Sequence, residues 1–293
     1  MITAALPYSN GRLHVGHVAG AYLPADTYVR YLRATGADVR FICGSDDNGV
    51  AALKSAREQN RSVEELTAHF NHRQQQDFSG LGIRFDIYGG THQPEYVTAH
   101  EKFSQDLFLV IHRKGFFTKR RSQQLFDVEA SQFLPDRFVR GTCPHCAGDQ
   151  AFGDQCEECG RSIDQTVLLN PVSVMTGSTP VLRDTVHWYL RLDRLQSRLA
   201  EWLNGKKETT DAAAAWRPIV LNQSLGRIEV EGLPERAMTR DLQWGVPVPL
   251  DDPDAAGKSL YVWFDAPIGY VTFTAADCQR RGEGAESYAH WWK

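Results

Sequence analysis

Residues 2–17 read ITAALPYSNGRLHVGH, and this stretch guides the interpretation of the rest of the chain. The apolar run ITAAL is typical of a short buried strand, and it stops at Pro7. A polar turn of serine, asparagine and glycine follows. His14 and His17 then flank Gly16, where the spacing of apolar residues predicts that a helix begins. The stretch therefore predicts a strand that turns into a helix, with two imidazoles at the junction.

The composition is that of an ordinary globular protein. The 293 residues are 42% hydrophobic, and 32 Lys and Arg against 36 Asp and Glu give a net charge of −4. This balance excludes nucleic-acid binding through overall charge alone. Lys119, Arg120 and Arg121 leave a local basic patch open, although a solvated turn is the favoured interpretation. No apolar run approaches the ~18–20 residues of a membrane span, and no signal peptide is recognisable. We therefore expect a cytoplasmic protein with no membrane partner.

Strand-like and helix-like segments alternate through the first part of the chain. Residues 17–36 have helical spacing, with a kink or a fresh helical start expected at Pro24. Residues 38–44 read as a buried strand, and Ser62 with Glu65 forms the capping box of a further helix. Two later segments continue the series, the strand-like residues 85–90 and the helix-like residues 94–115. This alternation predicts an α/β fold with a doubly wound parallel sheet.

The pattern becomes mixed from about residue 116 and returns to a strand followed by a helix at residues 258–279. Residues 179–203 alternate and then pass into a helix. Taken alone, residues 261–270, YVWFDAPIGY, are interpreted as a core strand. We therefore expect three regions, residues 1–115, 116–250 and 251–293.

Four of the six cysteines form two CxxC pairs with the spacing Cys143-x2-Cys146-x9-Cys156-x2-Cys159. Without a secretory signal, this spacing indicates a metal rather than disulfides. Two such knuckles supply the four thiolates of a closed tetrahedral zinc site, so we expect one structural Zn²⁺ per chain. An iron–sulfur site, or a cluster that has lost its metal, remains the alternative. His145 lies inside the first knuckle and is interpreted as a bystander.

The histidine pair is less specific. His14 and His17 are three residues apart and would lie near one face at the start of a helix. Unpaired backbone N–H groups and the helix dipole favour anions there, and imidazole donors would add to that site. Gly16 would let a flat ring such as adenine approach the backbone. Two ordinary surface histidines remain the alternative on these residues alone.

The position of the histidine pair after the first strand, where α/β sheets bind ligands, makes a family recognisable. ALPYSNGRLHVGH resembles the HIGH signature of class I aminoacyl-tRNA synthetases, in the form of the methionine-specific members. Five further segments resemble the family in order: FICGSDDNG, FLPDRFVRGTCPHC, GDQCEECG, TRDLQWGVPVP and YVWFDAPIGY. The resemblance implies the first half of a Rossmann-like nucleotide-binding domain at residues 1–115. It implies a connective insertion at 116–250, with the zinc knuckle at 143–159 and an opening for the tRNA acceptor end. Residues 251–293 would then begin the second half.

The resemblance also implies an activity. Methionine-specific members form methionyl-adenylate from methionine and ATP, and then transfer the methionyl group to tRNA(Met). His14 and His17 would be the catalytic residues, stabilising charge at the α-phosphate mainly by position and electrostatics. The residues implied for ATP, which Mg²⁺ would accompany, are Pro7, Tyr8, Asn10, His14, Gly16 and His17. A cysteine-specific member would place its metal beside the substrate, and the editing members usually carry a larger insertion.

A methionine pocket is implied in the same way. Asp46 matches the family aspartate that pairs with the substrate ammonium, and a carboxylate at a strand end suits that role. Aromatic rings suit the polarizable sulfur. The residues implied to surround methionine are Ala5, Leu6, Tyr8, Asp46, Trp263, Ala266, Pro267 and Tyr270. The alternative is that Asp46 and Asp47 only cap the next helix.

The chain departs from the family pattern at two places. Asn48 and Val50 stand where the family usually has histidine and threonine, so local substrate contacts are in question. The KMSKS loop and a helical anticodon-binding domain do not follow, and we expect a fragment of a longer synthetase with little activity alone. A non-catalytic, zinc-containing remnant that binds tRNA or a protein is the alternative. The oligomeric state is not predicted.

Overall fold

Three short parallel strands form the sheet of the first region. The computed structural model describes residues 1–209, 215–284 and 286–292. The strands are β1 (Ile2–Thr3), β2 (Phe41–Ser45) and β3 (Ile87–Gly90). They follow the order β1-β2-β3, with Thr3 opposite Ile42 and Ile42 opposite Ile87. The initial strand is thus present as predicted, although only its first two residues pair in the sheet.

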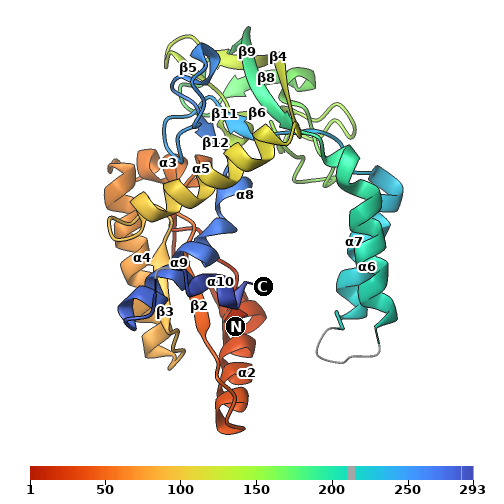
Figure 1. Ribbon diagram of the computed structural model, residues 1–293. Helices are drawn as coiled ribbons and strands as arrows, with labels where there is room; N and C mark the ends of the chain where they lie inside the picture. Colours follow the sequence, from red (N-terminus) through yellow and green to blue (C-terminus); the bar gives the residue numbers. More distant parts are fainter. Residues whose placement is uncertain (210–214, 285, 293) are drawn as a thin grey trace.

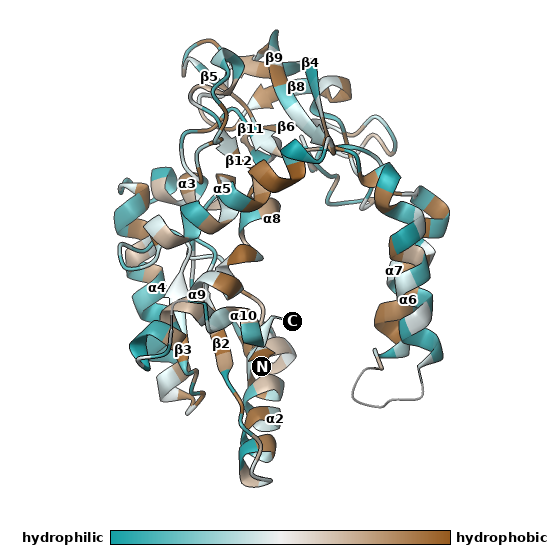
Figure 2. Ribbon diagram, viewed as in Figure 1, coloured by the Kyte–Doolittle hydropathy of each residue, from teal (hydrophilic) through white to brown (hydrophobic). Residues whose placement is uncertain are grey.

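Helices cover both faces of this sheet (Figure 1). They are α1 (Val15–His17), a π-helical turn (Val18–Tyr22), α2 (Leu23–Ala34), α3 (Val50–Glu58), α4 (Val63–Gly80), α5 (Val97–Arg113) and α9 (Ile268–Arg280). Side chains of a strand alternate between faces, so Phe41 and Cys43 pack toward α2 and α4. Ile42 packs instead against Phe273 of α9. Figure 2 accordingly shows β2 as a mainly apolar strand.

Two glycines allow α9 to approach the sheet closely. Phe273 lies against Gly44 of β2 and Gly89 of β3, and a Cβ atom at either position would overlap its ring. The two glycines therefore leave space on the surface of the sheet for one aromatic side chain. This contact holds α9, and with it the segment 261–270, against the end of β2.

The helix signals in the sequence are confirmed. The Ser62 side chain accepts a hydrogen bond from the Glu65 backbone N–H, and the Glu65 carboxylate accepts one from the Ser62 N–H. Helix α2 starts afresh at Leu23, with Pro24 in its first turn after the π-helical turn. Proline suits that position because its missing N–H would have no helical partner there.

The remaining sheets are antiparallel, which corrects the expectation of one doubly wound parallel sheet. The largest has the order β10-β9-β4-β5, formed by β4 (Phe117–Asp127), β5 (Gln132–Phe133), β9 (Val181–Leu190) and β10 (Arg236–Ala237). A second has the order β7-β6-β8, formed by β6 (Val139–Thr142), β7 (Ala151–Phe152) and β8 (Leu169–Ser173). β11 (Thr239–Arg240) pairs with β12 (Ser259–Leu260). Antiparallel strands need no helical crossover, so this region lacks the alternation seen before residue 116.

The basic run Lys119–Arg121 is part of a strand and not a turn. It lies within β4, opposite residues 186–188 of β9. Lys119 pairs with Asp252 at 2.7 Å, and Arg121 pairs with Asp184 at 3.6 Å. The run is therefore largely matched by local acidic residues.

A helical hairpin projects from the insertion on the side opposite α4 (Figure 1). It consists of α6 (Gln196–Glu208) and α7 (Pro218–Glu231), and the rings of Trp202 and Trp216 meet edge to face at 5.1 Å. Short 3₁₀ turns connect the other elements of this region: Asp136–Phe138, Gln165–Val167, Leu192–Leu195 and Pro253–Ala255.

The segment 261–270 is helical, so its interpretation as a core strand is wrong. After β12, α8 spans Val262–Asp265, α9 begins at Ile268, and α10 (Tyr288–Trp291) ends the described chain. Only Tyr261 is extended, as the residue before α8, and Pro267 caps α9 with a helical backbone. The pattern of apolar residues in segment 261–270 is compatible with a strand or a helix. Pro267 favours a helix start there, and α9 begins at the next residue.

Candidate functional site

The turn after β1 and the turn after β2 are joined by backbone hydrogen bonds. The Asp46 N–H donates to the Pro7 carbonyl at 2.9 Å, and the Ser9 N–H donates to the Asp46 carbonyl at 3.1 Å. These bonds form a parallel bridge between Tyr8 and Asp46, beyond the named strands. The segment that follows the first strand thus lies beside the acidic turn, at the carboxyl ends of the strands.

His14 and His17 hold each other in place. The His17 backbone N–H donates to His14 Nδ1 at 3.2 Å, and the His14 N–H donates to His17 Nδ1 at 3.4 Å. Their rings stack with centroids 3.6 Å apart. Because Nδ1 of each histidine accepts a hydrogen bond, each ring carries its proton on Nε2 when it is neutral. Burial and the neighbouring His14 lower the pKa of His17, which favours this neutral form. Both histidines and Gly16 are exposed, so two Nε2–H donors face solvent.

Three carboxylates are buried near the acidic turn: Asp46, Asp47 and Asp265. Asp47 is well satisfied, since its carboxylate accepts bonds from Ser45 Oγ at 2.5 Å and from the His92 N–H at 3.0 Å. Burial and the charges of Asp265 and Asp47 raise the pKa of Asp46 well above its usual range. Helix α3 starts at Gly49 without any side-chain cap, so Asp46 and Asp47 do not serve as its cap.

Asn48 joins this turn to two distant segments. Its Nδ2 donates to Asp265 Oδ2 at 2.7 Å, and its Oδ1 lies 3.0 Å from His92 Nδ1. The His92 ring lies over Trp244 at 3.9 Å, and Trp244 Nε1 donates to the Asp47 carbonyl at 2.8 Å. The amide that replaces the family histidine is therefore fully engaged.

The sequence did not single out Asp265, His92, His100 or Trp244 as site residues. His100 Nε2 lies 3.2 Å from Asp265 Oδ2, and both side chains are fully buried. Asp265 lies inside the quoted segment YVWFDAPIGY, where a charged residue among apolar ones is a signal that could have been followed. No spacing in the sequence links the other three to the acidic turn.

Two contacts join the segment 261–270 to the residues that follow β1. Tyr270 Oη donates to the Ala4 carbonyl at 2.9 Å, and Leu6 Cδ1 lies beside Gly269, one residue before Tyr270. Ala266 is buried, whereas Ala5 and Pro267 are exposed. Trp263 is 64% exposed and does not close over the other residues. Gly269 and Tyr270 therefore contact the segment after β1, whereas Trp263 is turned outward.

A cavity of about 700 Å³ opens beside these residues. Tyr8, Asn10, Asn48 and Trp263 line it on one side, whereas His14, His17 and Asp46 are not among its lining residues. Five cationic side chains and two carboxylates also line it: Lys54, Arg137, Arg227, Arg236, Arg240, Glu58 and Asp154. The cavity thus runs from the junction of the first two turns to the connective insertion and the α7 helix.

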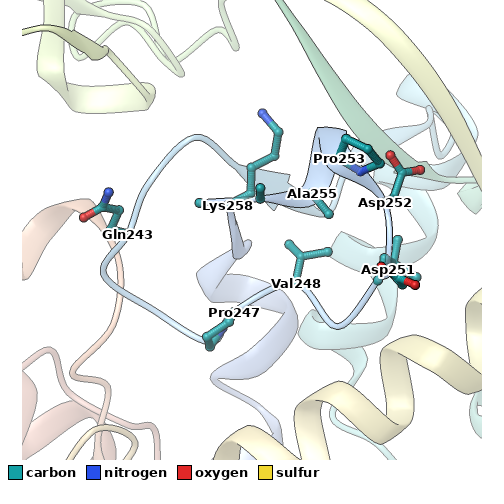
Figure 3. Close-up of a pocket in the computed structure, with 11 residues that line it drawn as sticks. Gln243, Pro247, Val248, Asp251, Asp252, Pro253, Ala255 and Lys258 are labelled. Atoms are coloured by element: carbon teal, nitrogen blue, oxygen red, sulfur yellow. The ribbon is translucent and has the colours of Figure 1, made fainter.

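A second cavity, of about 560 Å³, lies in the loop before β12 (Figure 3). Pro247, Val248 and Ala255 form its apolar wall, with Gln243 on the opposite side. It contains none of the residues expected to bind ATP or methionine.

The four knuckle cysteines form one cluster. Their Sγ atoms all lie within 4.8 Å of one another, with Cys143 to Cys159 at 3.9 Å and Cys146 to Cys156 at 3.8 Å. A tetrahedral zinc site with Zn–S bonds of about 2.3 Å requires sulfur separations of about 3.8 Å. The His145 N–H donates to Cys143 Sγ at 3.4 Å, which supports a thiolate there. The cluster therefore fits a metal such as zinc.

The knuckle packs against α3. Val50 and Leu53 of α3 contact the buried cluster that contains Cys143 and Cys156. The Arg57 guanidinium lies 5.7 Å from the Phe138 ring, in the same core. Because α3 begins directly after Asn48 and Gly49, the metal cluster supports the helix that leads out of the acidic turn.

A family model described as tRNA synthetases class I (M) matches residues 1–293. A curated methionine–tRNA ligase from Porphyromonas gingivalis is 45% identical over 294 residues, which cover 100% of this chain and 40% of that protein. One from Salinibacter ruber is 45% identical over 298 residues, with the same coverage of 100% and 40%. The chain therefore spans about 40% of the length of these relatives.

The fold also matches a solved structure, a Mycobacterium tuberculosis methionyl-tRNA synthetase bound by methionyl-adenylate. The TM-score is 0.65 at 21% sequence identity, and the match covers 93% of this chain and 46% of that chain. At this identity the likeness concerns the fold.

Proposed function

The chain belongs to the class I tRNA synthetases (M), and from that premise we propose that it carries the methionine-activating site of a methionine–tRNA ligase. The reaction would join methionine to ATP as methionyl-adenylate, with release of pyrophosphate, before transfer to tRNA(Met). The observation that carries this proposal is the bridge between Tyr8 and Asp46. It supports the proposal because Pro7 and Tyr8, proposed for ATP, lie next to Asp46, the carboxylate proposed for the methionine ammonium.

We propose that the histidine pair serves the ATP half of the site. Pro7, Tyr8 and Asn10 would line the nucleotide beside Gly16, and the two Nε2–H groups would donate to phosphate oxygens. Donors that are already oriented stabilise charge as it develops at the α-phosphate, without reorganising during the reaction. The stacking of His14 on His17 supplies this orientation. Mg²⁺ would neutralise charge on the phosphates when ATP is bound.

The acidic turn serves the methionine half. The substrate ammonium would meet Asp46, which is buried and has one oxygen that accepts no hydrogen bond from the described residues. The thioether chain would lie among Ala5, Leu6, Ala266, Pro267 and Tyr270, with Tyr8 at the edge. Trp263 would complete this wall by turning inward from its exposed position.

We propose one structural Zn²⁺ in the four-cysteine cluster. Four thiolates leave no open coordination position, so the metal would stabilise the knuckle and take no part in the reaction. The cationic side of the large cavity, toward the insertion, would receive the acceptor end of tRNA(Met). A non-catalytic remnant is not favoured, because curated relatives that are 45% identical are named methionine–tRNA ligases.

We further infer that β1, β2 and β3 belong to a larger doubly wound, Rossmann-like sheet. The helices on both faces and the parallel order support this inference. The boundaries at residues 115 and 250 and a cytoplasmic location remain predictions. No helix in the described ranges is long and apolar enough to span a bilayer.

The experiment is isothermal titration of the chain with L-methionine and with Mg·ATP, followed by methionine-dependent ATP–pyrophosphate exchange. We expect saturable binding of both ligands, and binding of L-methionine in preference to L-leucine or L-valine. Exchange driven by another amino acid, or equal binding of all three amino acids, would contradict the assignment to methionine.

A further inference from the structure

Two buried carboxylates near the proposed methionine site each have an oxygen without a partner. Asp46 is 5% exposed and Asp265 is 0% exposed. Within the part of the chain that the structure describes, neither Asp46 Oδ1 nor Asp265 Oδ1 has a hydrogen-bond donor. A buried carboxylate oxygen without a donor is costly, because it has lost its water and gained nothing in return. Such atoms point to a ligand that supplies donors.

Asn48 connects the acidic turn to Asp265. It lies two residues after Asp46, and its side-chain Nδ2 donates to Asp265 Oδ2 at 2.7 Å. His100 contacts the same Oδ2 atom at 3.2 Å. Asn48 and His100 therefore fix the position of Asp265 Oδ2. The other carboxylate oxygen, Oδ1, remains available as an acceptor.

The surroundings favour a compact cation with N–H donors. Asp265 is followed directly by Ala266 and Pro267, two residues proposed for the thioether wall. The end of α8 would thus carry a buried carboxylate next to Ala266, a buried residue of the proposed apolar wall. A primary ammonium has three donors, so it can satisfy both free oxygens and keep one donor for a carbonyl.

We propose that Asp265 is a second carboxylate for the substrate ammonium, acting together with Asp46, and that Asn48 is the residue that positions it. The proposal rests on the proposed function, because it concerns the amino group of the same substrate. In this proposal the side-chain amide of Asn48 orients the Asp265 carboxylate.

The ionisable groups around this pair set its protonation. Asp46 faces Asp265, Asp47 and Tyr270, while Asp265 faces His100 and, through Asn48, His92. Burial and the two neighbouring aspartates raise the pKa of Asp46, which favours a proton on this cluster when the site is empty. A bound ammonium favours the ionised forms, and its binding should therefore release a proton.

The test compares two small ligands by isothermal titration of the full chain. L-Methioninol has the ammonium and the thioether, whereas 4-(methylthio)butan-1-ol lacks only the amino group. Asp265→Asn should weaken binding of L-methioninol about tenfold or more, because one charge-assisted partner is lost. Binding of the deaminated alcohol should stay within about twofold, since its contacts are the apolar ones. Asp127→Asn, a buried carboxylate in the β4 turn, is the matched control and should change neither ligand.

Proton release gives a second readout that a purely structural role would not change. Titrations of L-methioninol in buffers of different ionisation enthalpy should show release for the natural chain and less for Asp265→Asn. Equal loss of both ligands, or unchanged L-methioninol affinity, would overturn the proposal. If Asp265→Asn does not fold, Asn48→Ala takes its place, and an unchanged preference for L-methioninol in that variant counts against the proposal. Failure of the natural chain to bind L-methionine would instead defeat the proposed function.

Discussion

Tyr8 and Asp46 form a parallel backbone bridge just beyond the paired residues of β1 and β2. The bridge is separated from the Thr3–Ile42 pair, because Pro7 beside Tyr8 has no N–H to donate to the ladder between them. The polypeptide on both sides is then free to turn outward with its side chains around a common space. In this way the sheet itself joins the proposed ATP and methionine residues.

Asp46→Asn should make the chain more stable and remove its affinity for methionine. The raised pKa of Asp46 means that the folded protein binds more protons than the unfolded chain between the usual and the raised pKa. Stability due to this group therefore falls as the pH rises through that window. At pH 7 the substitution should raise the free energy of unfolding by about 1 kcal/mol. Urea unfolding at pH 5 and pH 8, with methionine titration, measures both effects.

The gain from Asp46→Asn should be larger at pH 8 than at pH 5. Asp184→Asn is the control, because Asp184 is an exposed residue of β9 and its loss should change stability by less than about 0.5 kcal/mol. A less stable Asp46→Asn variant would show that Asp46 stabilises the fold and that its burial is not a cost of function.

Gly89→Ala should destabilise the chain by about 1 to 3 kcal/mol, because a Cβ atom would overlap the Phe273 ring in a packed core. Gly80→Ala in α4 is the control. Nothing lies within 4 Å of a Cβ atom there, so its effect should be neutral or stabilising by up to about 1 kcal/mol. Urea unfolding compares the two. Adding Phe273→Leu to Gly89→Ala should recover part of the loss, and no recovery would place the strain elsewhere.

The sequence predicted correctly those features that depend on residues close together in the chain. Ser62 and Glu65 form both bonds of their capping box, and the break at Pro24 separates α2 from the turn before it. The CxxC spacing likewise brings four thiols together, since each pair needs only a tight turn. These features depend on residues a few positions apart, which the sequence displays directly.

The contacts that organise the site depend on the fold. Asn48 and Asp265 are 217 residues apart, and tertiary packing such as that of Phe273 on the sheet brings their segments together. The segment 261–270 shows the same limit, because its apolar residues suit a strand as well as a short helix. In the antiparallel insertion, the alternation in residues 179–203 includes β9, but alternation alone does not identify the strands with which β9 pairs.

Acid should weaken the contact between α9 and the start of β2. Arg40, which precedes β2, pairs with Asp277 of α9 at 3.0 Å and also pairs with Glu283. Although burial opposes ionisation, hydrogen bonds and charge from Arg280 and Arg281 lower the pKa of Asp277. Its stabilising effect is therefore complete above the usual aspartate pKa and is lost as the pH falls through the lowered value. Thermal unfolding between pH 7 and pH 2.5 should show this loss.

Asp277→Asn should lower the Tm at pH 7 by about 3 °C or more. The variant and the natural chain should converge as the pH falls, because the natural carboxyl is then protonated too. A constant difference across the pH range would mean that the substitution acts through packing and not through charge.

Removal of the metal should loosen α3 as well as the knuckle. Val50 and Leu53 pack on the core that contains Cys143 and Cys156. Chelation should speed amide hydrogen exchange in residues 143–159 and in α3 by about tenfold or more, while α9 stays protected. Cys156→Ser should reproduce this effect with no bound zinc, whereas Cys278→Ser should retain one zinc per chain. Zinc-free protein with unchanged exchange in α3 would contradict the coupling.

Substitutions of His17 can separate the two proposed roles of its imidazole ring. Its Nδ1 accepts the His14 N–H, while its Nε2–H is the proposed phosphate donor. Asparagine places an oxygen near the Nδ1 position, so His17→Asn should keep the bond to His14 and lose the phosphate donor. Glutamine places its amide near the Nε2 position, so His17→Gln should keep a donor and lose that bond. Titration with Mg·ATP should show affinity about tenfold lower for His17→Asn and within about threefold of the natural chain for His17→Gln. The reverse order would assign the importance of His17 to the turn and not to phosphate contact.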